Sequence, residues 1–192
     1  MSSPEPPIGA VLAGGRGVRI GGEKATVMLA GRPLISYPLA ALQQVLDDVV
    51  VVAKASTALP ELGVDVWTEP EEPRHPLQGI VTALRAAGDR PVVICPCDLP
   101  LLSADTVRRL AQDARRAQAV IVRAAGTWQP LLGCYRPQAL DDLAGMLRLH
   151  PDRSLQRAVG ALVWLPVDVA EEELCNVNTP GEVAALEQRL RR

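Results

Sequence analysis

Short apolar runs alternate with longer amphipathic stretches along almost the whole chain, and this alternation restricts the fold more than any other feature. Several of the runs are continuously apolar, which is typical of parallel strands that are covered on both faces. The amphipathic stretches carry apolar residues at helical spacing. Strands are therefore predicted at residues 8–13, 49–53, 64–68, 92–96, 119–122, 131–135 and 162–167.

Helices are predicted between these strands and after the last one. Pro33 suits the first turn of one helix, Ser103 is an N-cap candidate for another, and Thr179 with Glu182 forms a capping box for the last. The repeated order of strand and helix predicts an α/β fold, a single Rossmann-like, doubly wound, mostly parallel sheet with helices on both faces. The predicted helices cover residues 33–46, 77–87, 104–117, 138–149 and 179–192.

The sequence contains no internal repeat, low-complexity block or clear linker. We therefore expect one domain over residues 8–192, preceded by a short disordered segment at residues 1–7 that is rich in Ser and Pro. Ligands of such folds bind beyond the carboxyl ends of the strands. The loops that follow the strands are where the chemistry is expected.

Charge and composition exclude several classes of partner. A formal net charge of -2 provides no general attraction to nucleic acid or an anionic membrane, and an aromatic content of 3% argues against a base-stacking platform. No apolar run is long enough to span a bilayer, and residues 1–7 do not resemble a secretion signal. Cys95, Cys97, Cys134 and Cys175 form no CxxC pair, and we interpret them as buried, reduced thiols of a cytoplasmic protein.

The segment after the first predicted strand, residues 12–24, is rich in glycine and in basic side chains. Glycine lets backbone amides approach an anion closely, and an exposed cation such as Lys24 supplies charge. It is not a P-loop, because Glu23 stands where that motif requires Lys, and Ile20 replaces the last glycine of a dinucleotide fingerprint. The segment predicts a polyphosphate site; the alternative is a glycine-rich surface loop with incidental cations.

Asp98 follows the strand predicted at residues 92–96, where we expect it to face solvent. A carboxylate at the end of a central strand suits Mg²⁺, which takes few protein ligands and keeps waters and substrate phosphates. A turn or cap role would explain Asp98 equally well. Asn176 and Asn178 pose a similar choice, because two alternating amides suit a metal or pterin site, whereas hydrogen bonding within a turn is favoured on the residues alone.

Five segments of the chain, taken in order, resemble the molybdenum cofactor guanylyltransferases. The resemblance covers nearly the whole chain, although its opening segment is shared with the wider family of sugar and alditol nucleotidyltransferases. Each segment is a weak signal by itself, whereas five in the family's order are specific. The segments are L-A-G-G…R-I-G-G-E-K-A (12–25), P-L-Q-G-I (76–80), P-C-D-L-P (96–100), Q-P-L-L-G-C-Y (129–135) and N-V-N-T-P-G-E (176–182).

The resemblance implies a Mg²⁺-dependent guanylyltransferase that moves GMP from GTP onto the terminal phosphate of the molybdenum cofactor (molybdopterin) and releases pyrophosphate. It implies Arg19, Lys24 and Asp98 as catalytic residues, with Asp98 as the metal ligand. It also implies transient contact with the proteins that deliver the cofactor and with molybdoenzymes. The implied nucleotide contacts are Leu12, Ala13, Gly14, Gly15, Arg16, Lys24, Glu69 and Asp98, and the implied pterin contacts are Arg19, Gly22, Arg153, Asn176 and Asn178.

The base site combines features that favour guanine with departures from the family. Related cytidylyltransferases resemble L-A-A-G at the first loop and lack P-L-x-G, so Gly14-Gly15 together with the P-L-Q-G segment at 76–79 favours guanine. Lys54 stands where relatives tend to carry Asn, Glu69 stands in the region where they carry Asp, and His75 replaces a Gly. A Glu keeps the acceptors for the N1–H and N2 amino groups of guanine but moves them.

The lack of a histidine-based nucleophile motif also agrees with nucleotidyl transfer. Neither His75 nor His150 belongs to a nucleophile motif, and an ionised phosphate needs positioning and charge neutralisation rather than a general base. The alternatives are a molybdopterin cytidylyltransferase or another small-metabolite nucleotidyltransferase, a non-catalytic GTP-binding module that releases no pyrophosphate, and a purely structural protein.

Overall fold

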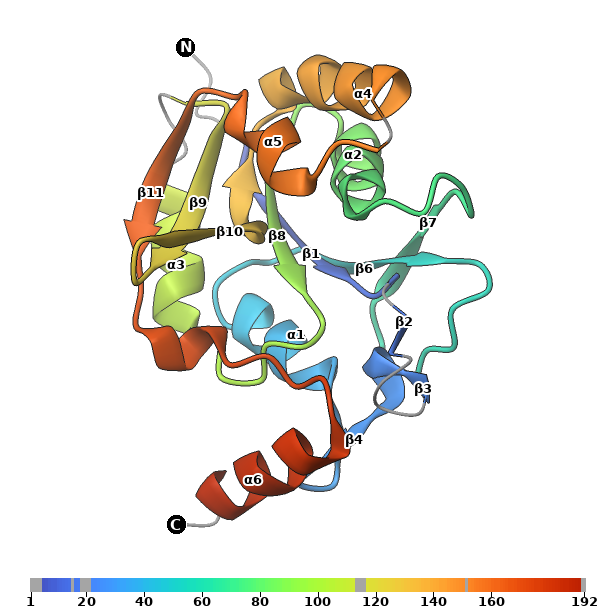
Figure 1. The fold of residues 1–192 in the computed structure, drawn as a ribbon, viewed down its shortest axis with the longest axis vertical. Helices are drawn as coiled ribbons and strands as arrows, with labels where there is room; N and C mark the ends of the chain where they lie inside the picture. Colours follow the sequence, from blue (N-terminus) through green and yellow to red (C-terminus); the bar gives the residue numbers. More distant parts are fainter. Residues whose placement is uncertain (1–4, 15, 18–21, 113–116, 151, 191–192) are drawn as a thin grey trace.

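A computed structural model describes residues 5–14, 16–17, 22–112, 117–150 and 152–190. Its centre is a 7-stranded sheet with the order β11-β9-β10-β8-β1-β6-β7 (Figure 1). β10 runs antiparallel to both of its neighbours and the other pairs are parallel, which confirms the predicted mostly parallel sheet. The strands are β1 (Ile8–Leu12), β6 (Val49–Lys54), β7 (Asp65–Glu69), β8 (Val92–Pro96), β9 (Ala119–Ala124), β10 (Thr127–Tyr135) and β11 (Trp164–Asp168).

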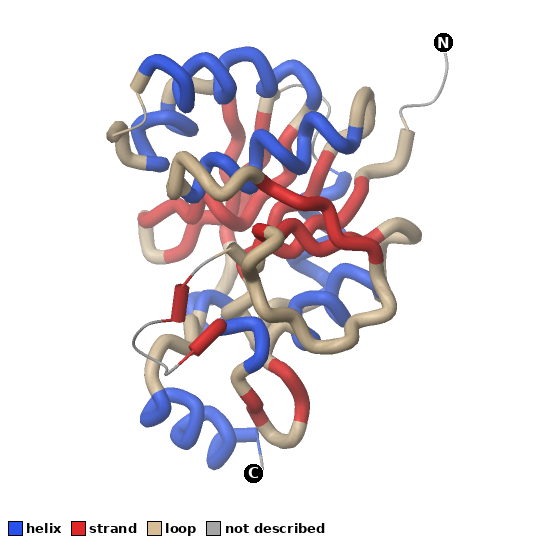
Figure 2. Tube along the Cα trace, turned by 90° about the vertical axis from the view of Figure 1, so that its right-hand side faces the viewer, coloured by secondary structure: helices blue, strands red, loops and turns tan. Residues whose placement is uncertain are grey.

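Helices cover both faces of this sheet, as predicted. One face packs against α1 (Ser36–Gln43) and α3 (Ala104–Gln112). The other packs against α2 (Pro76–Ala87), α4 (Leu140–Leu149) and α5 (Leu155–Gly160). Figure 2 shows the strands running between these two layers of helices. Because successive strand residues point to opposite faces, both faces of each continuously apolar strand are buried.

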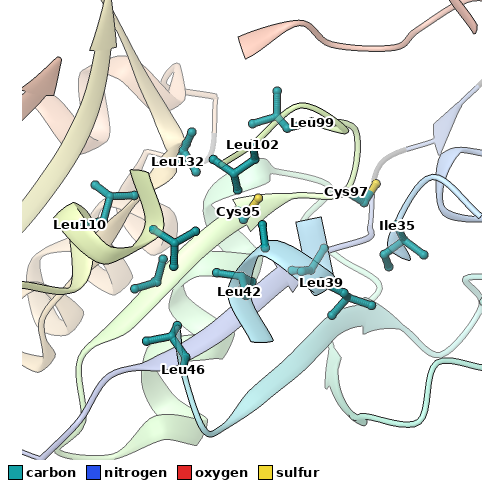
Figure 3. Close-up of a cluster of buried hydrophobic side chains, with 14 of the residues drawn as sticks. Ile35, Leu39, Leu42, Leu46, Cys95, Cys97, Leu99, Leu102, Leu110 and Leu132 are labelled. Atoms are coloured by element: carbon teal, nitrogen blue, oxygen red, sulfur yellow. The ribbon is translucent and has the colours of Figure 1, made fainter. Parts of the chain in front are cut away.

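The core beneath α1 and α3 is almost entirely aliphatic, with sulfur atoms among the leucines (Figure 3). Cys95 and Cys97 lie in this core together with Cys134, so the expectation of buried thiols is correct for these three. It is wrong for Cys175, whose side chain is exposed because it follows a surface turn rather than ending a strand.

The helix predicted from Pro33 begins later than its apolar spacing indicated. Pro33 lies in β5 (Arg32–Pro33), which pairs with β4 (Met28–Leu29) as a small hairpin. Ala30 and Gly31 close the hairpin with φ values of 47° and 80°. The expected first-turn role of Pro33 is therefore wrong, and α1 starts only after this hairpin.

Two further features differ from the simple alternation of strand and helix. β9 and β10 form an antiparallel hairpin, because Ala125 and Gly126 turn the chain with φ values of 45° and 78°. The short helix α5 was not predicted, and Ser154 caps it by accepting a hydrogen bond from the Arg157 amide. Ser103 caps α3 in the same way, through the Thr106 amide, as expected.

The last helix, α6 (Pro180–Leu190), lies at the lower end of the molecule, away from the sheet (Figure 1). The predicted capping box is present, because the Glu182 amide donates to Thr179 Oγ1 and the Thr179 amide donates to Glu182 Oε2, at 3.3 and 2.9 Å. Leu186 packs with Leu29 of β4 in a small separate cluster. No helix in the described part of the chain is long and apolar enough to cross a membrane.

Candidate functional site at the carboxyl ends of the strands

A cavity of about 550 Å³ opens where β1, β6, β7 and β8 end. Parallel strands place their carboxyl ends at one edge of the sheet, so the loops that follow them meet there. The cavity is lined by Leu12 and Gly14 after β1, by Lys54, Ser56 and Thr57 after β6, by Glu69, Glu71, Arg74, His75, Pro76 and Gly79 from the end of β7 to α2, and by Pro96, Cys97, Asp98 and Leu99 after β8. Lys24, Gln129, Leu131, Leu155, Gln156, Leu174 and Asn176 are also among its lining residues.

Lys24 and Asp98 form a close ion pair in this cavity. Lys24 opens a single 3₁₀ turn, η1 (Lys24–Thr26), and its Nζ donates to Asp98 Oδ2 at 2.6 Å and also to Asn178 Oδ1. The side chains of Lys24 and Asp98 are only 18% and 12% exposed. The expectations of an exposed loop cation and a solvent-facing carboxylate are both wrong, because each side chain covers the other.

The acidic groups near Asp98 bear on how a metal ion would be held. Among the described residues, no three His, Cys, Asp or Glu side chains gather into a cluster that could hold a metal ion. Asp98 therefore offers one carboxylate within the cavity. Such a donor set fits Mg²⁺, which binds through one or two carboxylates and takes its remaining ligands from water and substrate phosphates.

Glu69 occupies the opposite part of the cavity, at the end of β7, and its side chain is buried. Its carboxylate rests on two glycines: a Cβ on Gly14 would overlap Oε1, and a Cβ on Gly79 would stand 3.3 Å from Oε2. Burial raises the pKa of Glu69, and the nearby Lys54 ammonium opposes that rise. The two glycines leave room beside a carboxylate whose oxygens are hydrogen-bond acceptors when it is ionised.

Hydrogen bonds join the loops after β6 and β7 where these loops form the wall of the cavity. Lys54 Nζ donates to the carbonyl oxygens of Pro70 and Glu71, at 2.8 and 2.7 Å. In return, the Glu71 carboxylate accepts hydrogen bonds from the Ser56 amide and hydroxyl. The Ser56 bonds lower the pKa of Glu71. These contacts hold Glu69, which precedes Pro70, in a fixed part of the wall.

The structure brings most of the described nucleotide-site candidates to this cavity. Leu12, Gly14, Lys24, Glu69 and Asp98 line it. Ala13 is buried directly after β1, where its amide donates to the Val52 carbonyl. Its amide is thus occupied within the sheet, which leaves its carbonyl as the backbone group for any nucleotide contact.

The glycine-rich loop itself is only partly described. Arg16 lies in β2 (Arg16–Gly17) and Gly22 in β3 (Gly22–Glu23), which pair as a short antiparallel hairpin. Gly15 and Arg19 fall outside the described residues. The contacts expected for these four residues therefore stay predictions.

The pterin-site candidates do not all reach the same place. Asn176 lines the cavity and Asn178 bonds Lys24 at its edge, but the Arg153 side chain points elsewhere. It contacts the Met146 sulfur at 3.7 Å and lines a separate hollow with His150 and Arg157. In this arrangement Arg153 does not join the cavity, because its loop turns the guanidinium toward α4.

Several cavity residues were not recognised as functional from the sequence. His75 caps α2 by accepting from the Leu77 amide and bonds the Arg153 carbonyl with its other ring nitrogen, at 3.0 and 2.8 Å. Gln129 and Gln156 also line the cavity. Lys54 had a recognisable signal, because it ends the apolar strand β6 at the carboxyl edge of the sheet, where Glu69 ends β7.

Comparison with known protein families adds to this geometry. Residues 9–167 match the model of the MobA-like NTP transferase domain. The chain is 32% identical to a probable molybdenum cofactor guanylyltransferase of Carboxydothermus hydrogenoformans, covering 92% of this chain and 93% of the relative. It is 34% identical to a molybdenum cofactor guanylyltransferase of Burkholderia ambifaria, covering 98% of this chain and 99% of the relative.

Among solved structures, the fold resembles molybdopterin-guanine dinucleotide biosynthesis protein A of Archaeoglobus fulgidus. The TM-score is 0.79 at 25% sequence identity, covering 95% of this chain and 98% of that chain. The similarity in fold thus covers nearly the whole length of both chains.

Proposed function

The chain belongs to the MobA-like NTP transferase family, and from this premise we propose that it transfers GMP from GTP to the terminal phosphate of molybdopterin and releases pyrophosphate. The proposal draws its substrates from the full-length guanylyltransferase relatives. The observation that carries it is a single cavity with a glycine-flanked carboxylate, Glu69, in one part and the Lys24–Asp98 pair in another.

The part of the cavity around Glu69 is suited to the guanine base. An ionised carboxylate accepts two hydrogen bonds side by side, and guanine presents two adjacent donors, N1–H and the 2-amino group. Gly14 and Gly79 have no side chain that would cover the Glu69 oxygens. The backbone of Leu12 and Ala13 would form the neighbouring edge of the base site.

The part around Lys24 and Asp98 is suited to the triphosphate. Lys24 would move from Asp98 to the phosphates, and Gly14, Gly15 and Arg16 would supply backbone amides and charge. We propose that Asp98 holds Mg²⁺, which when bound supplies charge neutralisation to the triphosphate. Arg19, Gly22, Asn176 and Asn178 would face the pterin, and Arg153 would join them only if its side chain turned away from Met146.

The reaction itself needs one bond exchange. An oxygen of the pterin's terminal phosphate attacks the α-phosphorus of GTP, the new P–O bond forms, and the bond to the β-phosphate oxygen breaks so that pyrophosphate leaves. Because the nucleophile is already ionised, the protein contributes orientation and charge neutralisation. Lys24 and Arg16 are the side chains proposed to act on the charge of the leaving pyrophosphate, and Arg19 would act on the attacking phosphate of the pterin.

Pyrophosphate release tests this function directly. Purified protein is incubated with Mg²⁺ and GTP, CTP, ATP or UTP, each with and without molybdopterin. Release with GTP that depends on molybdopterin supports the proposal. Faster release with CTP would assign the chain to cytidylyl transfer, and GTP binding without release would leave only a binding module.

We also propose a cytoplasmic location and transient contact with cofactor-delivering proteins and molybdoenzymes. Both follow from the substrates rather than from a surface of the chain. Co-purification of the molybdoenzymes of the source cell with the tagged protein would test the second part.

A further inference from the structure

The sequence contains two lysines, Lys24 and Lys54. Its other permanently cationic side chains are arginines. Both lysines line the same cavity. Lys24 has a proposed role at the phosphates, whereas nothing in the proposed function uses Lys54. Its contacts therefore call for their own explanation.

The backbone places Lys54 directly beside Glu69. Lys54 is the last residue of β6 and Glu69 the last residue of β7, and the two are paired in the parallel register of these strands. Their side chains are 14% and 8% exposed, and Lys54 Nζ lies 4.0 Å from Glu69 Oε1. At that separation the ammonium acts on the carboxylate through charge rather than through a hydrogen bond.

The hydrogen bonds of Lys54 go instead to the chain that follows Glu69. Two of its three N–H groups reach the carbonyl oxygens of Pro70 and Glu71. Lys54 thereby ties the segment 69–71 to the end of β6. The Ser56–Glu71 bonds form a second link between the same loops, so the segment is held at two points.

Lys54 is the cation that acts on Glu69, whereas Arg74, which lines the same cavity, acts on Glu71. Burial and the Glu71 carboxylate both raise the pKa of Glu69, and Lys54 is the group that lowers it. Gly14 from the β1 loop and Gly79 from α2, which pack against the carboxylate, bring no charge of their own. An uncharged residue at position 54 would therefore leave Glu69 protonated over a wider range of pH.

We propose that Lys54 is a positioning residue for base selection: it clamps the segment 69–71 and keeps the Glu69 carboxylate ionised over Gly14 and Gly79, where it accepts both donors of guanine. This inference rests on the proposed function and adds a residue that acts through Glu69 rather than on the substrate. A protonated carboxyl group loses one acceptor position, so it no longer binds a base with two donors more tightly than a base with one.

The test compares GTP with inosine triphosphate, which keeps N1–H but lacks the 2-amino group. Dissociation constants for both nucleotides are measured by calorimetry at pH 6.5 and pH 8.5, in Mg²⁺ and without molybdopterin. The proteins are the wild type, Lys54→Met and the charge-conserving Lys54→Arg. Thermal melting of each variant is recorded at both pH values.

We expect the wild type to bind GTP about tenfold more tightly than inosine triphosphate at both pH values, since an unpaired buried acceptor lowers affinity by about this factor. Lys54→Met should lose part of that ratio, and more of it at pH 6.5 than at pH 8.5, because removal of the ammonium raises the pKa of Glu69. Lys54→Arg should keep the ratio at both. General damage to the fold would weaken both nucleotides together and leave their ratio independent of pH.

Two results would overturn the inference. One is a Lys54→Met ratio at pH 6.5 equal to that of the wild type. The other needs no variant, and so holds even if Lys54→Met does not fold: a wild-type ratio that itself collapses between pH 8.5 and pH 6.5 means that Lys54 does not keep Glu69 ionised. Failure of the proposed function is separate, because it would show as tighter wild-type binding of CTP or ATP than of GTP.

Discussion

Lys24 Nζ donates to Asp98 Oδ2 at 2.6 Å and to Asn178 Oδ1, so one ammonium joins residues 74 and 154 positions away along the chain. The contact links η1, the end of β8 and the segment before α6. In the proposed reaction Asp98 binds a metal ion and Lys24 binds phosphate, so both must give up this partner. The Lys24–Asp98 ion pair would thus be exchanged for ion pairs with the phosphates and the metal ion.

Asp98→Asn should abolish turnover and also destabilise the protein. The amide keeps the size of the side chain but lacks the charge that Mg²⁺ requires, so pyrophosphate release should fall by at least about a hundredfold. Because the pair with Lys24 is largely buried, we expect a loss of about 1–3 kcal/mol in the free energy of unfolding, measured in urea. Magnesium-dependent release at a near-normal rate would rule out Asp98 as the metal ligand.

Lys24→Met should separate metal binding by Asp98 from phosphate binding by Lys24. Without the ammonium, Asp98 is free to hold a divalent cation in the absence of nucleotide, and Mn²⁺ binding followed by electron paramagnetic resonance should strengthen by about tenfold. Turnover should fall, because the phosphates lose their cation. Lys24→Arg is the matched control, and it should bind free Mn²⁺ as weakly as the wild type. Equal Mn²⁺ affinity in wild type and Lys24→Met would show that the pair does not restrain Asp98.

The strands around the site could be predicted from the sequence, because each is formed by a run of neighbouring apolar residues. The ends of β1 and β8 follow from continuous apolar runs, and both lie where expected. The glycine and carboxylate residues that come next were therefore placed at the correct edge of the sheet. The capping box before α6 could also be predicted, because its partners, Thr179 and Glu182, are three residues apart.

Features that depend on tertiary contact or on an uncommon backbone conformation could not be predicted from local sequence in this way. The Lys24–Asp98 pair joins residues 74 positions apart, and each residue by itself resembles an exposed loop residue. The hairpin that displaces Pro33 depends on positive φ at Ala30, a conformation that non-glycine residues adopt rarely. Arg153 lies in the expected loop, but packing against Met146 decides where its guanidinium points.

His75→Ala should destabilise the protein through two contacts at once. The ring accepts from the Leu77 amide at the start of α2 and bonds the Arg153 carbonyl, so the variant leaves a helix end uncapped and a carbonyl without that partner. We expect a loss of about 1–2 kcal/mol by urea unfolding. His75→Asn keeps a capping oxygen and should recover part of the loss. A His75→Ala variant as stable as the wild type would show that water replaces both contacts.

Gly14→Ala tests the base site at Glu69 Oε1, the carboxylate oxygen that Lys54 also faces. The added methyl group would overlap Glu69 Oε1, so the carboxylate must move away from the place where guanine is proposed to meet it. GTP affinity should fall by about tenfold or more, and the fall should be smaller for inosine triphosphate, which uses one donor fewer.

The matched control is Gly145→Ala in α4, where an added Cβ meets no atom within 4 Å. That change should leave nucleotide binding unaltered and stabilise the helix by about 0.5–1 kcal/mol, because alanine favours helix more than glycine does. If Gly14→Ala retained the wild-type affinity and the wild-type ratio between the two nucleotides, the base would have to bind away from Glu69.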